Sequence, residues 1–165
     1  MAGKSVLFNA PPANLADRDP KFISEMLPRL WLAASVWFRA EVNGFEKVPD
    51  EPVLFVGNHS GGAGVPDTFV FILAYNTWFT VQGRPLYALG HEIVTGLPVV
   101  GTLARKFGVV TAEPESAARV FAADASALVY PGGDVEALGP WRDRHKIVFN
   151  NRKGFLRIAH ANNVK

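Results

Sequence analysis

The sequence contains no cysteine, so disulfide bonds and thiolate metal sites are excluded, although the compartment in which the protein works stays open. It also contains no uninterrupted apolar run of about 18–20 residues, the length that a membrane-spanning helix needs. The first 20 residues have only a short apolar core and are broken by prolines, so we expect no signal peptide. The formal net charge is only +2 and no long lysine and arginine tract occurs, which argues against a nucleic-acid partner.

Several familiar signatures are also missing. The chain has no G-x-x-x-x-G-K-[ST] sequence, so its glycine-rich segments are not nucleotide-binding P-loops. It has no G-x-S-x-G sequence, which argues against the serine nucleophile of an α/β-hydrolase. His59 has no cysteine or close histidine partner, so we predict neither a metal site nor a bound cofactor.

The composition that remains is that of one apolar domain. A chain of 165 residues can bury a substantial core. Its 48% hydrophobic and 19% charged residues lie at the apolar end of the range for soluble domains. A large buried core would explain the high hydrophobic and low charged fractions. An exposed apolar surface, of the kind that a lipid-facing enzyme needs, would explain them equally well.

The chain divides into three parts. Residues 1–20 are polar and contain prolines, so we expect a flexible lead-in. Residues 21–39 are apolar and helical in composition, and Pro28 should kink this helix or divide it in two. The simpler interpretation is a helix packed across a sheet, and the alternative is a helix at a lipid interface with its tryptophans at headgroup level. Residues 40–165 form the remaining domain.

Within residues 40–165, short β-branched and apolar runs alternate with helical stretches. We expect strands at 40–43, 53–56, 85–90, 108–112, 127–130 and 147–149, and helices at 68–79, in short pieces within 91–107, at 114–124 and at 152–163. This alternation predicts an α/β fold with a largely parallel, mixed sheet flanked by helices.

The most informative segment is VLFVGNHSGGAGVPD, residues 53–67, in which a strand ends in a polar pair and a glycine-rich loop. Open α/β sheets place their chemistry at such strand ends. Imidazole can accept and return a proton near neutral pH, so His59 is the candidate general base. The alternative is a histidine that only bonds the loop backbone. Residues assigned to substrate binding beside it are Asn58, Ser60, Gly61 and Gly62.

Asp67 has two interpretations that the spacing does not separate. Its carboxylate could orient His59, as the aspartate of a catalytic triad does. It could equally be an ordinary N-cap of the helix that follows.

A second glycine turn follows the expected strand 127–130. Adjacent Gly132 and Gly133 free the backbone to approach a ligand, or form only a tight turn. Strand order allows this turn to share one edge of the sheet with the His59 loop. Arg142 belongs to a nearby cationic cluster that could hold a phosphate or lipid headgroup, although such clusters are commonly solvated surface.

GNHSGG…PD together with LVYPGGDVEA resembles the glycerolipid (lysophospholipid) acyltransferase superfamily, in the branch similar to type-2 diacylglycerol acyltransferases. The resemblance covers about residues 42–162. It implies transfer of an acyl group from acyl-CoA or acyl carrier protein, as co-substrate, to a lipid hydroxyl. It places His59 as general base and Gly132, Gly133 and Glu136 in a block that binds acceptor or donor. Backbone N–H groups of a glycine turn would meet the oxyanion.

The sequence departs from the family pattern in three places. The usual acid lies five residues after the histidine, where this chain has Gly64, and Asp67 lies eight after. The second block usually ends in an arginine that grips a glycerol phosphate, and Glu113 and Pro114 stand there instead, which favours a neutral alcohol such as a diacylglycerol. The family also continues into a further strand after the last helix, so the resemblance predicts an incomplete domain at the C-terminus.

Taken together, the sequence predicts a fatty acyltransferase acting as a peripheral protein at the cytoplasmic face of a membrane. One alternative is an acyl-lipid-binding protein of the same fold with weak or no catalysis. Another is a thioesterase-like hydrolase in which water replaces the acceptor.

Overall fold

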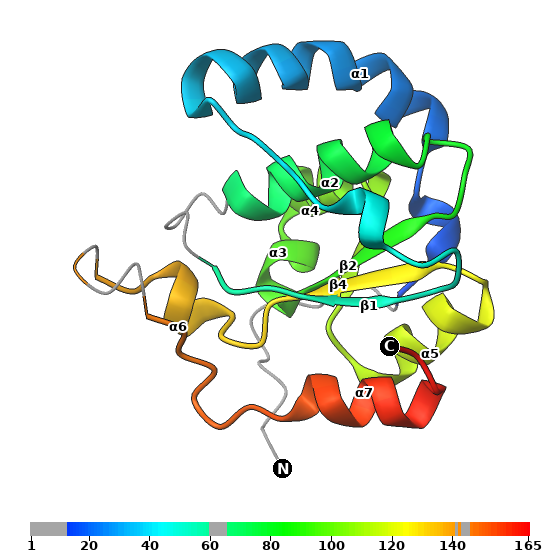
Figure 1. Cartoon of the computed structure of the whole chain (residues 1–165), viewed down its shortest axis with the longest axis vertical. Coiled ribbons are helices and arrows are strands. Elements are labelled where there is room, and N and C mark those ends of the chain that lie inside the picture. The colour runs from blue at the N-terminus through cyan, green and yellow to red at the C-terminus, as the bar shows by residue number, and fades with distance from the viewer. Residues whose placement is uncertain (1–12, 60–65, 141, 143–145) are drawn as a thin grey trace.

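The computed structural model describes residues 13–59, 66–140, 142 and 146–165, and its helices lie on both sides of a parallel sheet (Figure 1). In chain order the described elements are η1 (Leu15–Asp17), α1 (Pro20–Ala33), η2 (Ala34–Phe38), η3 (Phe45–Lys47), β1 (Leu54–Val56), α2 (Pro66–Trp78), β2 (Leu86–Gly90), α3 (Glu92–Gly96), α4 (Pro98–Lys106), β3 (Val109–Thr111), α5 (Pro114–Ala122), β4 (Ser126–Val129), α6 (Asp134–Ala137) and α7 (Gly154–Asn162).

The sheet has the strand order β1-β4-β2-β3, and all of its described pairings are parallel. The expected α/β class is confirmed, with a sheet that is parallel throughout its described pairings rather than mixed. The last strand in sequence, β4, lies between β1 and β2, with Phe55 opposite Leu128 and Leu89 opposite Val129. Because parallel strands all end at the same edge, the loops after β1 and β4 become direct neighbours.

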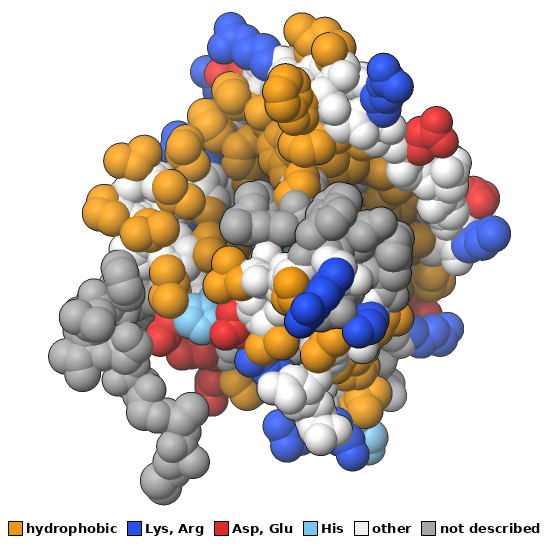
Figure 2. Space-filling model, turned by 90° about the vertical axis from the view of Figure 1, so that its left-hand side faces the viewer, with side chains coloured by type: hydrophobic (Ala, Val, Ile, Leu, Met, Phe, Trp, Pro, Cys, Tyr) orange, Lys and Arg blue, Asp and Glu red, His pale blue; other side chains and the backbone are white. Residues whose placement is uncertain are grey.

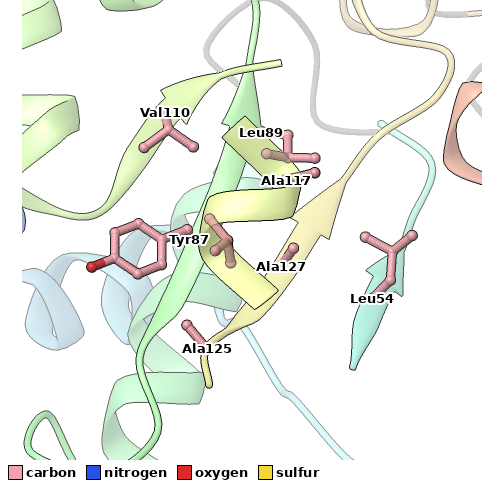
Figure 3. Close-up of a cluster of buried hydrophobic side chains, with 8 residues drawn as sticks. Leu54, Tyr87, Leu89, Val110, Ala117, Ala125 and Ala127 are labelled. Carbon is pink, nitrogen blue, oxygen red and sulfur yellow. The ribbon is translucent and has the colours of Figure 1, made fainter. Parts of the chain in front are cut away.

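The core is divided by the sheet into two clusters, as the two-residue period of strand side chains requires. Tyr87 and Leu89 point to the side of α5, whereas Leu86 and Ala88 point to the side of α2. Figure 3 shows the first cluster, which joins Ala117 of α5 to side chains from all four strands. Each strand therefore buries both faces, which explains why these runs are almost continuously apolar.

Two expected strands are absent. Residues 40–43 and 147–149 have no strand pairing, although both are described. Glu41 and Asn43 are exposed, and no described strand lies beside them. In the second segment the Val148 N–H donates to the Glu136 carboxylate instead of to a strand. Propensity alone predicted these strands, and the lack of a pairing partner prevented them.

Residues 13–19 differ from the flexible lead-in that we expected. They carry η1, and Arg18 is buried with its guanidinium donating to Asn76 Oδ1 (2.9 Å) and to the Val81 carbonyl (3.2 Å). Helix α1 then passes through Pro28 without a break. Ser24 and Pro28 are both exposed, so water can bond the carbonyl that proline leaves without a donor.

The apolar residues that end this N-terminal helix are not packed across the sheet. Leu32, Val36 and Trp37 are 67%, 70% and 82% exposed. The interpretation of a buried helix is therefore wrong for this end, and contact with lipid stays a prediction. Among the described helices, none combines the length and the apolar character needed to cross a bilayer.

Candidate active site

The segments that follow β1 and β4, residues 57–59 and 130–133, meet where these strands end. The Gly57 N–H donates to the Val129 carbonyl over 3.0 Å, which continues the strand pairing by one residue. Just beyond that bond each segment contributes one ring, His59 from the first and Tyr130 from the second. The sheet order therefore brings together two loops that are more than 70 residues apart in sequence.

His59 and Tyr130 stack face to face. Their ring centroids are 4.0 Å apart and their planes differ by 14°. Gly57 makes this stack possible, because a Cβ atom at that position would lie 2.7 Å from Cε1 of the Tyr130 ring. Burial of the phenol raises the pKa of Tyr130 to about 12, and the negative charge of Asp67 acts in the same direction. Tyr130 therefore stays a neutral ring beside the imidazole at any ordinary pH.

Asp67 also contacts the imidazole, at Nδ1. This nitrogen lies 3.2 Å from Oδ2 and 3.3 Å from Oδ1 of the carboxylate. The His59 and Asp67 side chains are only 11% and 19% exposed, so water screens their interaction weakly. Asp67 lies inside the first turn of α2 rather than before it, and its Oδ1 also accepts from the Thr68 N–H (2.8 Å). Asp67 therefore contacts the His59 ring and also accepts a hydrogen bond from the first turn of α2.

The second glycine turn leads into α6 and is held by two charged side chains. Oε2 of Glu136 accepts from the His59 N–H (3.0 Å), and its Oε1 accepts from the Val148 N–H (2.8 Å). Arg152 donates to the Gly132 carbonyl (3.0 Å) and to Asp134 Oδ1 (2.9 Å). The bond from Arg152 lowers the pKa of Asp134 below its ordinary value.

A side chain at either glycine of this turn would displace one of these two charged side chains. A Cβ atom at Gly132 would overlap the side chain of Glu136. Gly133 has φ +52°, and a Cβ atom there would lie 2.9 Å from Nη1 of Arg152. The groups that approach these glycines belong to this chain, and the assignment of Gly132 and Gly133 to substrate binding stays a prediction.

A large cavity opens beside His59. Its volume is about 1530 Å³, and it runs along the carboxyl ends of the strands between α2, α4, α5 and α7. Most of its lining is apolar, including Ile72, Leu103 and Phe107 from the helices on one side of the sheet. The charged residues in the described part of its lining are Glu113, Glu115, Asp134, Arg152 and Arg157. A space of this size and polarity suits a long hydrocarbon chain better than a small polar ligand.

The predicted site residues do not all reach this cavity. Of those described, His59 and Gly133 line it, whereas Asn58, Asp67, Gly132, Glu136 and Arg142 do not. Arg142 is exposed. Ser60, Gly61 and Gly62 lie outside the described residues. No cluster of three or more potential metal-binding side chains occurs in the described part of the chain.

Sequence reasoning passed over three residues of the site. Gly57 and Tyr130 form the support of the imidazole, and Arg152 holds the second turn. A glycine directly before the Asn58-His59 pair was a visible signal for a close backbone contact. Nothing local to Arg152 could have shown its partner 20 residues earlier.

Comparisons with known proteins agree with this architecture. A family model described as Acyltransferase matches residues 39–164. Uncharacterized proteins of Mycobacterium tuberculosis and Mycobacterium leprae are 33% and 35% identical over 144 residues, which is 86% of this chain and 39% and 38% of theirs. A bovine protein named DGAT1/2-independent enzyme synthesizing storage lipids is 30% identical over 158 residues, 94% of this chain and 44% of its own. No solved structure matches.

This chain thus spans about two fifths of the length of the curated relatives that it matches. The family match covers the sheet, both glycine loops and the cavity beside His59. The chain therefore belongs to the acyltransferase family, within the glycerolipid acyltransferase superfamily that its two glycine motifs resemble.

Proposed function

We propose that this chain moves a fatty acyl group from a thioester donor, acyl-CoA or acyl carrier protein, to a lipid hydroxyl, with His59 as the general base. One observation carries the proposal. The His59 imidazole, paired through Nδ1 with Asp67 at 3.2 Å, forms part of the wall of a largely apolar cavity of about 1530 Å³.

The chemistry follows from that pairing. Asp67 accepts the Nδ1–H of His59, which leaves the lone pair of Nε2 available to the substrate. Nε2 takes the proton of the acceptor hydroxyl while its oxygen attacks the thioester carbonyl carbon. The tetrahedral intermediate then breaks its C–S bond, and the departing sulfur receives the proton back from the imidazolium. The products are an ester and a free thiol, without an acyl-enzyme.

We further propose that the acceptor is a neutral lipid alcohol such as a diacylglycerol. Glu113 and Glu115 line the cavity, and a carboxylate repels a phosphate. Of the two arginines in the lining, Arg152 is already paired with Asp134. The acceptor test compares diacylglycerol with lysophosphatidic acid. Diacylglycerol should be acylated faster, and a clear preference for lysophosphatidic acid would contradict this assignment.

We propose that the chain binds peripherally to the cytoplasmic face of a membrane, where a water-soluble donor can reach it. Figure 2 shows hydrophobic side chains gathered on the side where Figure 1 places the end of α1. Val36 and Trp37, in η2 where it continues α1, are the most exposed apolar side chains of that region. Replacing both by serine should weaken binding to phosphatidylcholine vesicles about tenfold or more. Leu156→Ser, on exposed α7 at the opposite end, is the matched control.

The activity test uses the absence of cysteine. Because the protein has no thiol, a thiol reagent reports only the thiol released from acyl-CoA. Release should require a lipid alcohol, produce the ester, and stop in His59→Ala. His160→Ala, an exposed histidine of α7, is the matched control and should keep full activity. Release without an acceptor would identify a hydrolase, and tight acyl-lipid binding without release would identify a binding protein.

A further inference from the structure

The carboxylate of Glu136 joins three segments that are distant in sequence. Its Oε2 accepts the backbone N–H of His59 (3.0 Å), and its Oε1 accepts the backbone N–H of Val148 (2.8 Å). The side chain lies folded over Gly132, where a Cβ atom would overlap it. Both oxygens are thus occupied by this chain's own backbone.

His59 is consequently held at three points. Asp67 bonds Nδ1 of its ring, Tyr130 covers one face of the ring, and Glu136 bonds its main-chain nitrogen. The first two contacts set the direction of the ring. The third fixes the backbone from which the ring projects.

We propose that Glu136 is a positioning residue, which fixes the His59 backbone and links it to residues 146–149, and that it does not bind substrate. The proposal rests on the function proposed above, because it names how the general base of that reaction is held. Bonds from amide N–H groups to a carboxylate are stronger than bonds between neutral groups, so this bridge is a firm attachment. Each carboxylate oxygen keeps a second lone pair, so it is position that opposes substrate binding: Glu136 is not among the described residues that line the cavity.

Two further observations favour this role. Among the described residues that line the cavity are Gly133 and Asp134, the neighbours of Glu136 in the turn, but not Glu136 itself. Arg152 also anchors the same turn, through the Gly132 carbonyl and Asp134. Arg152 therefore holds the turn in place, and the hydrogen bond from the His59 N–H to Glu136 fixes the His59 main chain relative to this turn.

The first experiment measures amide hydrogen exchange by NMR in the ligand-free protein. Glu136→Ala should speed exchange of the His59 and Val148 amides by about tenfold or more, since each loses the carboxylate oxygen that accepts its N–H. The Gly57 amide, bonded to Val129, should not change. Unchanged exchange at His59 would overturn the proposal. If Glu136→Ala does not fold, Glu136→Gln is used instead: one amide oxygen cannot serve both donors, so exchange of the His59 or the Val148 amide should rise, and unchanged exchange of both would overturn the proposal.

The second experiment separates positioning from substrate binding by kinetics. Glu136→Ala and Glu136→Gln should lower kcat on the order of 10- to 100-fold, because a small displacement of the base is costly, and should change both KM values less than about twofold. A raised KM with unchanged kcat would show that Glu136 binds substrate and would overturn the proposal. Glu46→Gln, a surface carboxylate of η3, is the matched control. If the wild-type chain transfers no acyl group, the proposed function fails, and the exchange measurement still decides the role of Glu136.

Discussion

Nδ1 of His59 lies 3.2 Å from Oδ2 of Asp67 although the acid stands eight residues after the histidine instead of five. The end of β1 and the first turn of α2 provide the two positions, so the pairing depends on how these elements are placed and not on the number of residues between them. A spacing of eight residues instead of five therefore still allows the carboxylate of Asp67 to contact the His59 ring.

Asp67→Asn should lower kcat by about 10²–10⁴-fold with little change in stability. The asparagine oxygen can still accept the Thr68 N–H, so the start of α2 keeps its bond. Its NH₂ group, however, would donate to Nδ1 of His59, which places the ring proton on Nε2 and removes the base. Steady-state kinetics and urea unfolding test the two halves of this prediction. Asp50→Asn, at an exposed surface pair, should leave kcat unchanged, and an Asp67→Asn enzyme of normal kcat would contradict the orienting role.

Tyr130→Phe should retain activity within about threefold, whereas Tyr130→Ala should lose at least about tenfold. Phenylalanine keeps a ring to stack on His59, and alanine leaves the imidazole unsupported on one face. Because the pKa of Tyr130 is raised to about 12, its phenol does not titrate between about pH 5 and 10. The profile of kcat against pH should thus have the same shape in Tyr130→Phe and wild type. If the rise or the fall of kcat with pH seen in wild type were missing from Tyr130→Phe, the phenol would take part in proton transfer.

Gly57→Ala should disturb the site through the tyrosine ring. The added methyl would lie 2.7 Å from Cε1 of Tyr130, so the ring must move and His59 loses its stacking surface. We expect kcat to fall and the free energy of unfolding to drop by about 1–3 kcal/mol, the usual range for overpacking. Gly154→Ala is the control, because a Cβ atom at that position would have no neighbouring atom within 4 Å. Equal activity of both variants would mean that the stack has no role in catalysis.

Arg18→Met should destabilise the domain by about 2–4 kcal/mol. The substitution leaves Asn76 Oδ1 and the Val81 carbonyl without their buried donor. Burial also lowers the pKa of Arg18, so the folded protein holds this charge at a cost that its hydrogen bonds must offset. Urea unfolding of Arg18→Met beside Arg29→Met, an exposed arginine of α1, provides the measurement. A variant as stable as the control would show that the buried hydrogen bonds of Arg18 add nothing to stability.

The Asp134–Arg152 pair should contribute a small, acid-sensitive share of stability. Its hydrogen bond to Arg152 lowers the pKa of Asp134 in the folded state. The contribution is therefore complete above the unfolded value of about 3.9 and is lost as the pH falls through the lower folded value. Asp134→Asn should cost less than about 1 kcal/mol at pH 7, because both side chains are partly exposed, and almost nothing at pH 2. A difference that grew toward low pH would contradict this assignment.

Much of the architecture could be predicted from local pattern. The four core strands, the split helices α3 and α4, and the shared edge of the two glycine loops all follow from apolar runs and turn residues. The failures share one cause. Residues 40–43 and 147–149 have the composition of strands but no described strand beside them, and the apolar end of α1 has no core to cover. Pairing and packing are properties of neighbours, which a local pattern does not contain.

By itself the sequence determined the fold class, the position of His59 at a strand end and the resemblance that the family match confirmed. Only the tertiary structure decided which groups surround the imidazole. Asp67 reaches it because the end of β1 and the start of α2 are placed together, and Tyr130 and Glu136 reach it because β4 inserts next to β1. Residues 77 positions apart can share a hydrogen bond only after the sheet has chosen its strand order, and that choice minimises the free energy of the whole core rather than of any segment.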